Sequence, residues 1–136
     1  MQRTIMESNL EVVKKLYTAF KSGDGKVISQ IFQAEIVWEK MEVFPHGGTR
    51  IGTSTVFEKV FDMFTMYWNN WGSVPEQFDA SGNKVFVTGY YHGVSIESGK
   101  EMHAPLIHVY TLKGGLINHF KQYMDTHLIQ RAPVND

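Results

Sequence analysis

The chain has 136 residues, the size of one ordinary domain, which is enough to bury roughly two thirds of the surface of the unfolded chain. Its 13 Lys and Arg nearly balance 14 Asp and Glu, and no run of like charge occurs, which argues against binding to nucleic acid or to an anionic membrane. No cysteine is present, so disulfides, thiolate zinc sites and thiol nucleophiles are excluded.

Neither a membrane segment nor a leader is evident. The sequence contains no stretch of about 18 apolar residues. Residues 1–8 lack the apolar centre of a signal peptide. We therefore expect a cytoplasmic protein.

The first third of the chain shows helical periodicity. Ser8 and Glu11 form a capping-box pattern, and apolar residues then recur at helical spacing to about Lys21. Gly23 supplies the stop and Asp24 the next N-cap. The pattern predicts two helices joined almost without a loop.

A strand and a third helix are expected next. Residues 36–43 alternate with strand propensity and end before the turn residues Gly47 and Gly48. A third helix opens at Gly52, with a second capping box at Thr55, and it is apolar almost all round. Such a helix is expected to be buried on more than one side.

The rest of the chain is β-structure separated by glycine turns, with no internal repeat. Short connections between successive strands favour a mostly antiparallel meander. Helices followed by strands indicate an α+β architecture, and only the tail after Gln130 is expected to be loose. The expected strands are residues 72–78, 84–95, 101–112 and 116–125.

Two segments carry a family resemblance that covers nearly the whole chain. Residues 13–24 and 115–126, with Gly52 and His103-Ala104-Pro105 between them, resemble the SnoaL-like branch of the nuclear transport factor 2-like superfamily and the related steroid isomerases. The resemblance implies one cystatin-like domain shaped as a cone. In that fold, three N-terminal helices pack on a strongly curved, mostly antiparallel sheet whose concave face lines a pocket.

The known catalytic sets of two related enzyme groups are absent. Where steroid isomerases need a Tyr and two Asp, the best match has Leu16, Lys40 and Ile107. Limonene-type epoxide hydrolases pair an Arg-x-Asp on a middle strand with an Asp on the last strand. On the middle strand this chain has residues 89–91, Gly-Tyr-Tyr, so only the last-strand Asp125 of that set is present.

Similarity to SnoaL-like polyketide cyclases implies an acid/base pair of a last-strand Asp and a penultimate-strand His. Asp125 matches the first, and either His103 or His108 can supply the second. The two histidines are five residues apart, so a regular strand points them to opposite faces. Matching the segment to the steroid isomerases places His103 in the pocket, and we expect Asp125 and His103 as the catalytic pair.

The same matching assigns the two faces of the sheet. The residues expected to bind ligand in the pocket are Trp38, Lys40, Tyr91, Ile107, His119, Lys121 and Tyr123. A contiguous aromatic patch is expected on the outer face, where it would pair two copies as a homodimer. Its residues would be Phe86, Tyr90, His108, Tyr110, Phe120, Gln122 and Met124.

Each assignment has a structural alternative. Asp125 can cap the final turn or pair with Lys121, and His103 can be a hydrogen-bonded core or rim residue. The six histidines lack the close spacing of a metal motif, so we expect neither metal nor cofactor. Gly89 and Gly93, expected on the concave face, indicate either bends of the sheet or room for a ligand.

The expected function is acid/base isomerisation or aldol-type cyclisation of a small hydrophobic carbonyl compound, with Asp125 as base. The large number of Phe, Tyr, Trp and Met side chains suits a core wrapped around such a ligand, a sizeable interface or a well-filled core. The alternatives are a ligand-binding or accessory domain without turnover, and a scaffold whose cone is filled.

Overall fold

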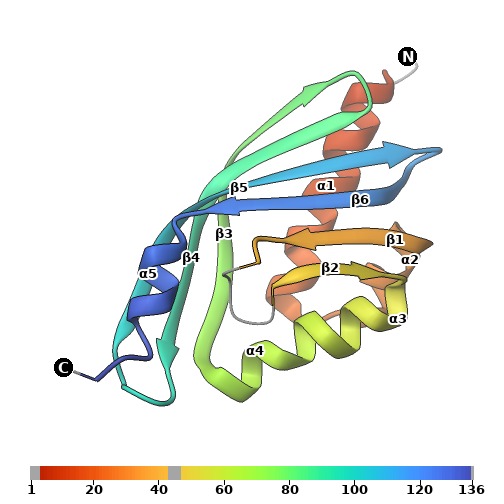
Figure 1. Cartoon of the computed structure of the whole chain (residues 1–136). Coiled ribbons are helices and arrows are strands. Elements are labelled where there is room, and N and C mark those ends of the chain that lie inside the picture. The colour runs from red at the N-terminus through yellow and green to blue at the C-terminus, as the bar shows by residue number, and fades with distance from the viewer. Residues whose placement is uncertain (1–3, 43–46, 136) are drawn as a thin grey trace.

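The computed structural model describes residues 4–42 and 47–135 (Figure 1). Six strands form one curved, open sheet, and the helices are shared between its concave face and its ends. The helical segments are α1 (Ile5–Ser22), α2 (Gly25–Ile31), α3 (Thr53–Val56), the π-helical turn η1 (Phe57–Phe61), α4 (Asp62–Tyr67) and α5 (Thr126–Arg131).

The sheet has the strand order β2-β1-β6-β5-β4-β3. All neighbouring strands are antiparallel except β1 and β6, which run parallel. This arrangement confirms the α+β class and the mostly antiparallel sheet. The strands are β1 (Phe32–Lys40), β2 (Gly48–Ile51), β3 (Trp68–Ser81), β4 (Lys84–Ser95), β5 (Glu101–Lys113) and β6 (Leu116–Met124).

The first helix begins one turn earlier than predicted. Thr4, not Ser8, is its N-cap, and the Thr4 Oγ1 accepts a hydrogen bond from the backbone N–H of Glu7 at 3.0 Å. The predicted end at Gly23 is confirmed, because this residue has the left-handed φ of 71° that favours glycine. Asp24 caps α2 as predicted, through the N–H of Val27 at 3.2 Å.

The region between β1 and α4 differs most from the prediction. The strand β1 ends at Lys40, and the predicted end at Val43 lies outside the described residues. Gly48 opens the short edge strand β2 rather than only a turn. The third helix begins after Gly52, but no side chain caps it, so the capping box expected at Thr55 is not formed.

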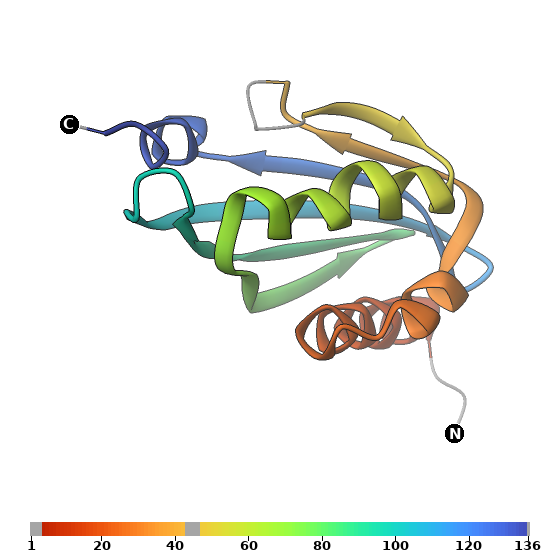
Figure 2. The same ribbon diagram turned by 90° about the horizontal axis from the view of Figure 1, so that it is seen from below.

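The core lies between the helices and the concave face of the sheet. Figure 2 shows α3 and α4 crossing this face, with α1 and α2 at one end of the molecule. The side chains of Leu16, Ile36 and Val56 are fully buried there. The helix α5, which was not predicted, adds a second cluster at the other end, where Ile129 packs with Met102, Ala104 and Leu106.

The tail beyond α5 contacts the β4–β5 turn. The Ala132 side chain is buried, and its backbone oxygen accepts a hydrogen bond from the Ser98 hydroxyl. The Val134 oxygen accepts another from the Lys100 ammonium at 2.5 Å. Residues 131–135 are therefore anchored where a loose tail was expected after Gln130. No helix in the described ranges 4–42 and 47–135 is both long and apolar enough to cross a membrane.

The inward faces of β5 and β6 are opposite to those expected. In the register of β4 and β5, Tyr91 lies opposite Ala104, so odd residues of β4 share a face with even residues of β5. Tyr110 and Phe120 are accordingly buried on the concave face, whereas Ile107 is 44% exposed on the outer face.

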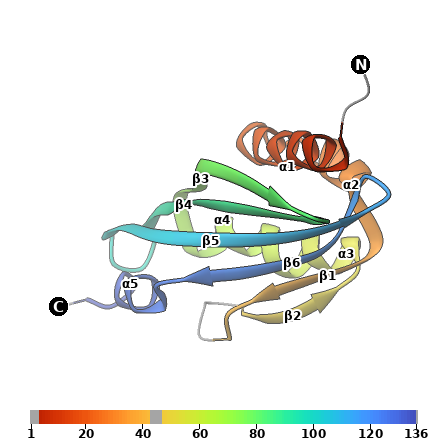
Figure 3. The same cartoon turned by 90° about the horizontal axis from the view of Figure 1, so that it is seen from above.

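The expected outer patch is therefore wrong in five of its members. His108, Tyr110, Phe120 and Gln122 are buried on the concave side, and Met124 packs against the second cluster near α5. The physical reason is that a one-residue shift of register turns every side chain of a strand over, and motif matching did not determine this register. Figure 3 shows from above the neighbouring strands β1, β6, β5 and β4, whose pairing determines which side chains face inward.

The two glycines of β4 accommodate protein atoms rather than a ligand. A Cβ atom on Gly89 would lie 2.0 Å from the Val74 backbone oxygen, next to an irregularity of β3. A Cβ atom on Gly93 would lie 3.2 Å from the rings of Trp68 and Trp71. Of the two interpretations, a bend with close strand approach therefore fits Gly89, and close ring packing fits Gly93.

We expect Asp125 to stabilise the fold by capping α5. Its Oδ1 accepts a hydrogen bond from the N–H of His127 at 3.0 Å. Asp125→Ala should lower the free energy of unfolding by about 1 kcal/mol, whereas Asp125→Asn should change it by only a few tenths, because Asn caps helices about as well. Urea unfolding measures both, and equal losses in the two variants would contradict this role.

Candidate functional site

A cavity of about 550 Å³ lies between the helices and the concave face of the sheet. The helices line it mainly with the aromatic side chains of Phe57, Phe61 and Phe64. The sheet contributes Trp38, Trp68, Trp71, Tyr91 and Phe120. Its size is in the usual range of small-molecule sites.

The aromatic wall is held by ring-to-ring packing. Trp38 stacks on Phe120 across β1 and β6, with ring centroids 3.7 Å apart. Phe64 of α4 stacks on Trp71 of β3 at 4.5 Å, and Trp71 stacks on Tyr91 at 5.1 Å. These contacts fix rigid rings around the hollow, so the cavity is an ordered, apolar space.

A chain of hydrogen bonds crosses the concave face beneath the aromatic wall. The Tyr110 hydroxyl donates to the Tyr17 hydroxyl at 2.8 Å, and Tyr17 meets His108 Nδ1 at 2.5 Å. On the other side of the imidazole, His108 Nε2 meets the Tyr91 hydroxyl at 2.5 Å. Gln122 Nε2 donates to that same hydroxyl at 2.7 Å. Four residues of the sheet and one of α1 are thus linked.

The directions of these bonds follow from counting protons. Because Tyr17 accepts from Tyr110, its own proton goes to His108 Nδ1, and the imidazole therefore carries its proton on Nε2 and donates it to Tyr91. The backbone N–H of Met41 donates to Gln122 Oε1 at 3.3 Å, which orients the amide. The bonds from both sides therefore converge on Tyr91, a residue that lines the cavity.

Burial keeps these groups neutral. It lowers the pKa of the His108 imidazole to about 3. Burial also raises the pKa values of the Tyr17, Tyr91 and Tyr110 hydroxyls above their ordinary value. At neutral pH these hydrogen-bonded side chains form a network of neutral donors and acceptors. Such a network can donate a hydrogen bond to a ligand oxygen that gains negative charge.

Lys40 brings an amine into the same cavity. Its side chain is 6% exposed at the end of β1, and its Nζ lies 4.9 Å from the centre of the Phe64 ring. Burial, and then the nearby positive charge of Arg50, lower the pKa of the Lys40 ammonium to about 7. A large part of the Lys40 population is therefore an uncharged amine at neutral pH.

Few charged side chains other than Lys40 line the cavity. Asp62, exposed in the first turn of α4, is the one carboxylate lining the cavity among the described residues. A second hollow of about 710 Å³ adjoins the first, shares Phe20 and Trp71 with it, and has Lys14 and Lys21 of α1 at its border. Within the ranges that the structure describes, no group of three His, Asp or Glu is placed to hold a metal ion.

The structure divides the residues predicted to bind ligand between two faces. Trp38, Lys40 and Tyr91 line the cavity, as expected. The other four residues predicted to line the pocket lie on strand positions of the outer face, and for them the expected orientation is wrong. These are Ile107, His119, Lys121 and Tyr123, none of which lines the cavity.

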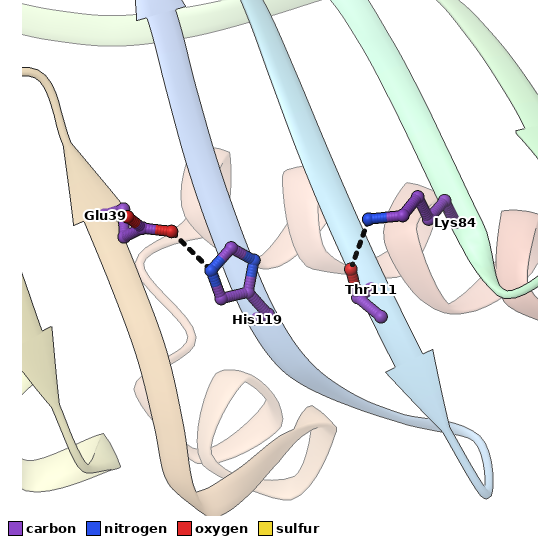
Figure 4. A network of polar contacts seen from close by, with 4 residues as sticks. All are labelled: Glu39, Lys84, Thr111 and His119. Carbon is purple, nitrogen blue, oxygen red and sulfur yellow. Dashed lines mark hydrogen bonds and ion pairs between the residues drawn. The ribbon is translucent and has the colours of Figure 1, made fainter.

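The outer-face residues have partners of their own there. His119 Nε2 lies 2.5 Å from the Glu39 carboxylate, and Figure 4 shows this pair on the side of the sheet away from the helices. The Lys121 ammonium lies 5.2 Å from the centre of the Tyr123 ring. Hydrogen bonding to Tyr123 is the first cause that raises the Lys121 pKa.

The residues predicted as catalytic do not meet. His103 is exposed on the outer face and stacks on Tyr90, with ring centroids 4.1 Å apart. Asp125 is exposed and caps α5, so the alternative interpretation of a capping residue describes its position. The histidine of the cavity is His108, the alternative that the sequence left open. The strand register decided between the two.

Two polar residues of the site, Tyr17 and Gln122, were missed, and His108 was weighed only as the alternative to His103. The matched parity turned the two strand residues outward, and Tyr17 fits the apolar periodicity of α1. One signal was present, since His108 and Gln122 interrupt an otherwise apolar set at alternate positions of β5 and β6. Buried polar side chains at such positions need hydrogen-bond partners.

We expect His108 to make the fold sensitive to acid. The unfolded chain binds a proton at this imidazole below pH 6.5, but the folded protein does so only near pH 3. Folding free energy should therefore be lost as the pH falls from 6.5 to 3, on the order of a few kcal/mol. His108→Gln keeps a donor and an acceptor but does not titrate, so the free energy of unfolding should depend less steeply on pH in this variant. Urea unfolding at stepped pH tests this, and parallel slopes in both proteins would contradict it.

Comparisons with known proteins identify the family and the fold. The sequence profile of the SnoaL-like domain matches residues 13–120. A nuclear transport factor 2-like protein from Burkholderia thailandensis is 26% identical, with 96% of this chain and 98% of that chain covered and a TM-score of 0.88. The comparison with curated proteins found no match.

Two further solved structures share the fold at lower identity. TerC, co-crystallised with polyporic acid, is 20% identical over 93% of this chain and 98% of its own, with a TM-score of 0.84. A protein from Jannaschia sp. CCS1, named as a SnoaL-like polyketide cyclase, is 17% identical over 97% and 96%, with a TM-score of 0.82. With the profile match covering most of the chain, these findings identify it as a member of the SnoaL-like domain family, with the nuclear transport factor 2-like fold.

Proposed function

We propose that this chain binds a small hydrophobic carbonyl compound in its aromatic cavity and catalyses acid/base chemistry next to the carbonyl, as an isomerase or aldol-type cyclase. The observation that carries the proposal is the placement of Lys40 in the cavity beside the neutral network of His108, Tyr91 and Gln122. Apolar rings would hold the body of the ligand, and the polar groups would orient its oxygen.

The chemistry needs a base and a donor in one dry site. The amine of Lys40 is partly uncharged near pH 7 and can take part in proton removal. The hydrogen-bond chain that ends at Tyr91 can stabilise the developing enolate oxygen, because its donors are already in place. The role of base, expected at Asp125, is therefore proposed for Lys40.

The alternative is a binding protein without turnover. It is favoured by the position of His108, whose two ring nitrogens are both engaged by tyrosine hydroxyls. A histidine held in this way orders the floor of the cavity without exchanging protons with a ligand. The co-crystallisation of TerC with polyporic acid gives a precedent for small-molecule complexes in this fold.

Deuterium exchange separates turnover from binding without knowledge of the natural substrate. β-Tetralone, an apolar bicyclic ketone, has exchangeable protons next to its carbonyl, and NMR in D₂O follows their loss. We expect the protein to accelerate this exchange and Lys40→Met to lower the acceleration by about 10² or more. Quenching of tryptophan fluorescence measures β-tetralone binding independently, because three tryptophans line the cavity.

Two matched variants serve as controls. Lys121→Met removes an amine that lies over an aromatic ring on the outer face, and it should leave exchange unchanged. Asp125→Asn should also leave exchange unchanged. Binding of β-tetralone without accelerated exchange would establish the binder instead of the enzyme, and an absence of binding would refute both functions for this ligand class.

We further propose that two copies pair through the outer face of the sheet. Ile107 and Tyr123 lie opposite each other in neighbouring strands and are 44% and 42% exposed. Pro105 and His103 extend this surface along β5. A second copy is the commonest cover for such a face, through a two-fold axis.

Light scattering at micromolar concentration should report about twice the chain mass, the value for a two-fold dimer. Ile107→Glu should shift the protein toward monomer, because it buries a charge in the interface. Ile51→Glu, on the edge strand β2, should not. A Phe120→Glu variant cannot test assembly, since Phe120 is stacked on Trp38 inside the cavity wall. A monomeric wild-type protein would refute the pairing.

A further inference from the structure

The surroundings of Lys40 combine three features that favour covalent rather than only proton-transfer chemistry. Its side chain is buried and lines a largely aromatic cavity of about 550 Å³. The Arg50 guanidinium of β2 is a second positive charge near it. Amines become nucleophilic when they are desolvated in an apolar pocket or placed beside another cation, and Lys40 meets both conditions.

The geometry points to Lys40 as a nucleophile that forms an imine with the carbonyl carbon of an aromatic or other apolar ketone or aldehyde bound in the cavity. This inference rests on the proposed function and specifies how its carbonyl compound is activated.

The step balances without an oxidant or a reductant. The lone pair of Lys40 Nζ attacks the carbonyl carbon, the N–C bond forms, and the C=O π electrons move to oxygen, which takes a proton from the nitrogen. The C–O bond then breaks, and oxygen leaves as water with a further proton. The resulting iminium draws electrons from the neighbouring C–H bonds, which makes that carbon more acidic, and hydrolysis restores the free amine.

The neighbouring groups are suited to this sequence. The titratable groups that share the cavity with Lys40 are Asp62 from α4, Tyr91 from β4 and His108 from β5, with Arg50 of β2 nearby. His108 is neutral, and it donates toward Tyr91 at 2.5 Å. Hydroxyl and imidazole groups can relay the proton that the departing oxygen needs. The lowered pKa of Lys40, about 7, supports an uncharged amine at neutral pH.

Reductive trapping tests the inference. The folded protein is incubated with β-tetralone and sodium cyanoborohydride at pH 7, and the site of the stable secondary amine is read by peptide mass spectrometry. Lys40 should carry the adduct at least about tenfold more than any other lysine, because ordinary lysines are almost wholly protonated at this pH. The rate of labelling should rise with pH and level off above about 7, following the neutral amine.

Two variants make the result specific. Lys40→Met should lose the pH 7 adduct, and Lys121→Met, the matched amine over an aromatic ring on the outer face, should keep it. If a variant does not fold, the position of the adduct in the wild-type protein still tests the inference. Labelling spread evenly over the lysines would overturn the inference, as would a persistent single adduct in Lys40→Met.

The same probe separates this inference from the proposed function. Accelerated deuterium exchange without any trapped adduct would overturn the imine and leave acid/base chemistry at Lys40 standing. If β-tetralone neither binds nor exchanges, both the imine and the proposed function fail. A Lys40 adduct together with accelerated exchange is the expected result.

Discussion

The arrangement of the site depends on one buried imidazole. His108 of β5 contacts Tyr17 of α1 through Nδ1 and Tyr91 of β4 through Nε2, so it ties the first helix to the middle of the sheet. Because an unsatisfied polar group in this core would cost about 1–3 kcal/mol, the helix and the strands must meet in a way that satisfies both ring nitrogens. Burial keeps His108 neutral, and its contacts with the two tyrosines set the direction of the hydrogen bonds toward the cavity.

Around this link, the fold leaves a hollow that its own side chains do not fill. The curved sheet turns its concave face to α4, and stacked rings such as Trp38 on Phe120 give the cavity rigid walls. Lys40 adds a buried amine to this largely aromatic lining, and burying it has a cost. The unfolded chain keeps the Lys40 proton up to about pH 10.5 and the folded protein only to about pH 7. This linkage makes the folded state more stable as the pH rises across that window. Strongly shifted pKa values cluster at functional sites, and Lys40 has such a value inside the cavity.

The two faces of the sheet divide the charged and polar side chains in a consistent way. His119 and Glu39 pair on the outer face, and Lys121 lies over Tyr123 beside them. Asp125 ends β6 and begins α5, whose Ile129 closes the far end of the core. Groups that match catalytic positions by motif are thus used for surface pairing and helix capping, whereas the cavity is lined by a lysine and residues of the neutral hydrogen-bond network.

The sequence by itself determined the α+β class, the family resemblance, most element positions and three cavity residues, Trp38, Lys40 and Tyr91. Local signals sufficed for the elements, since periodicity, Gly23 and the Asp24 cap act within a few residues, and the three cavity residues came from the family resemblance. Only the tertiary structure decided which face of β5 and β6 turns inward, because strand side chains alternate and the register is set by pairing with β4 across the sheet. With this register, His108 rather than His103 faces the cavity. Asp125 lies outside the cavity and caps α5.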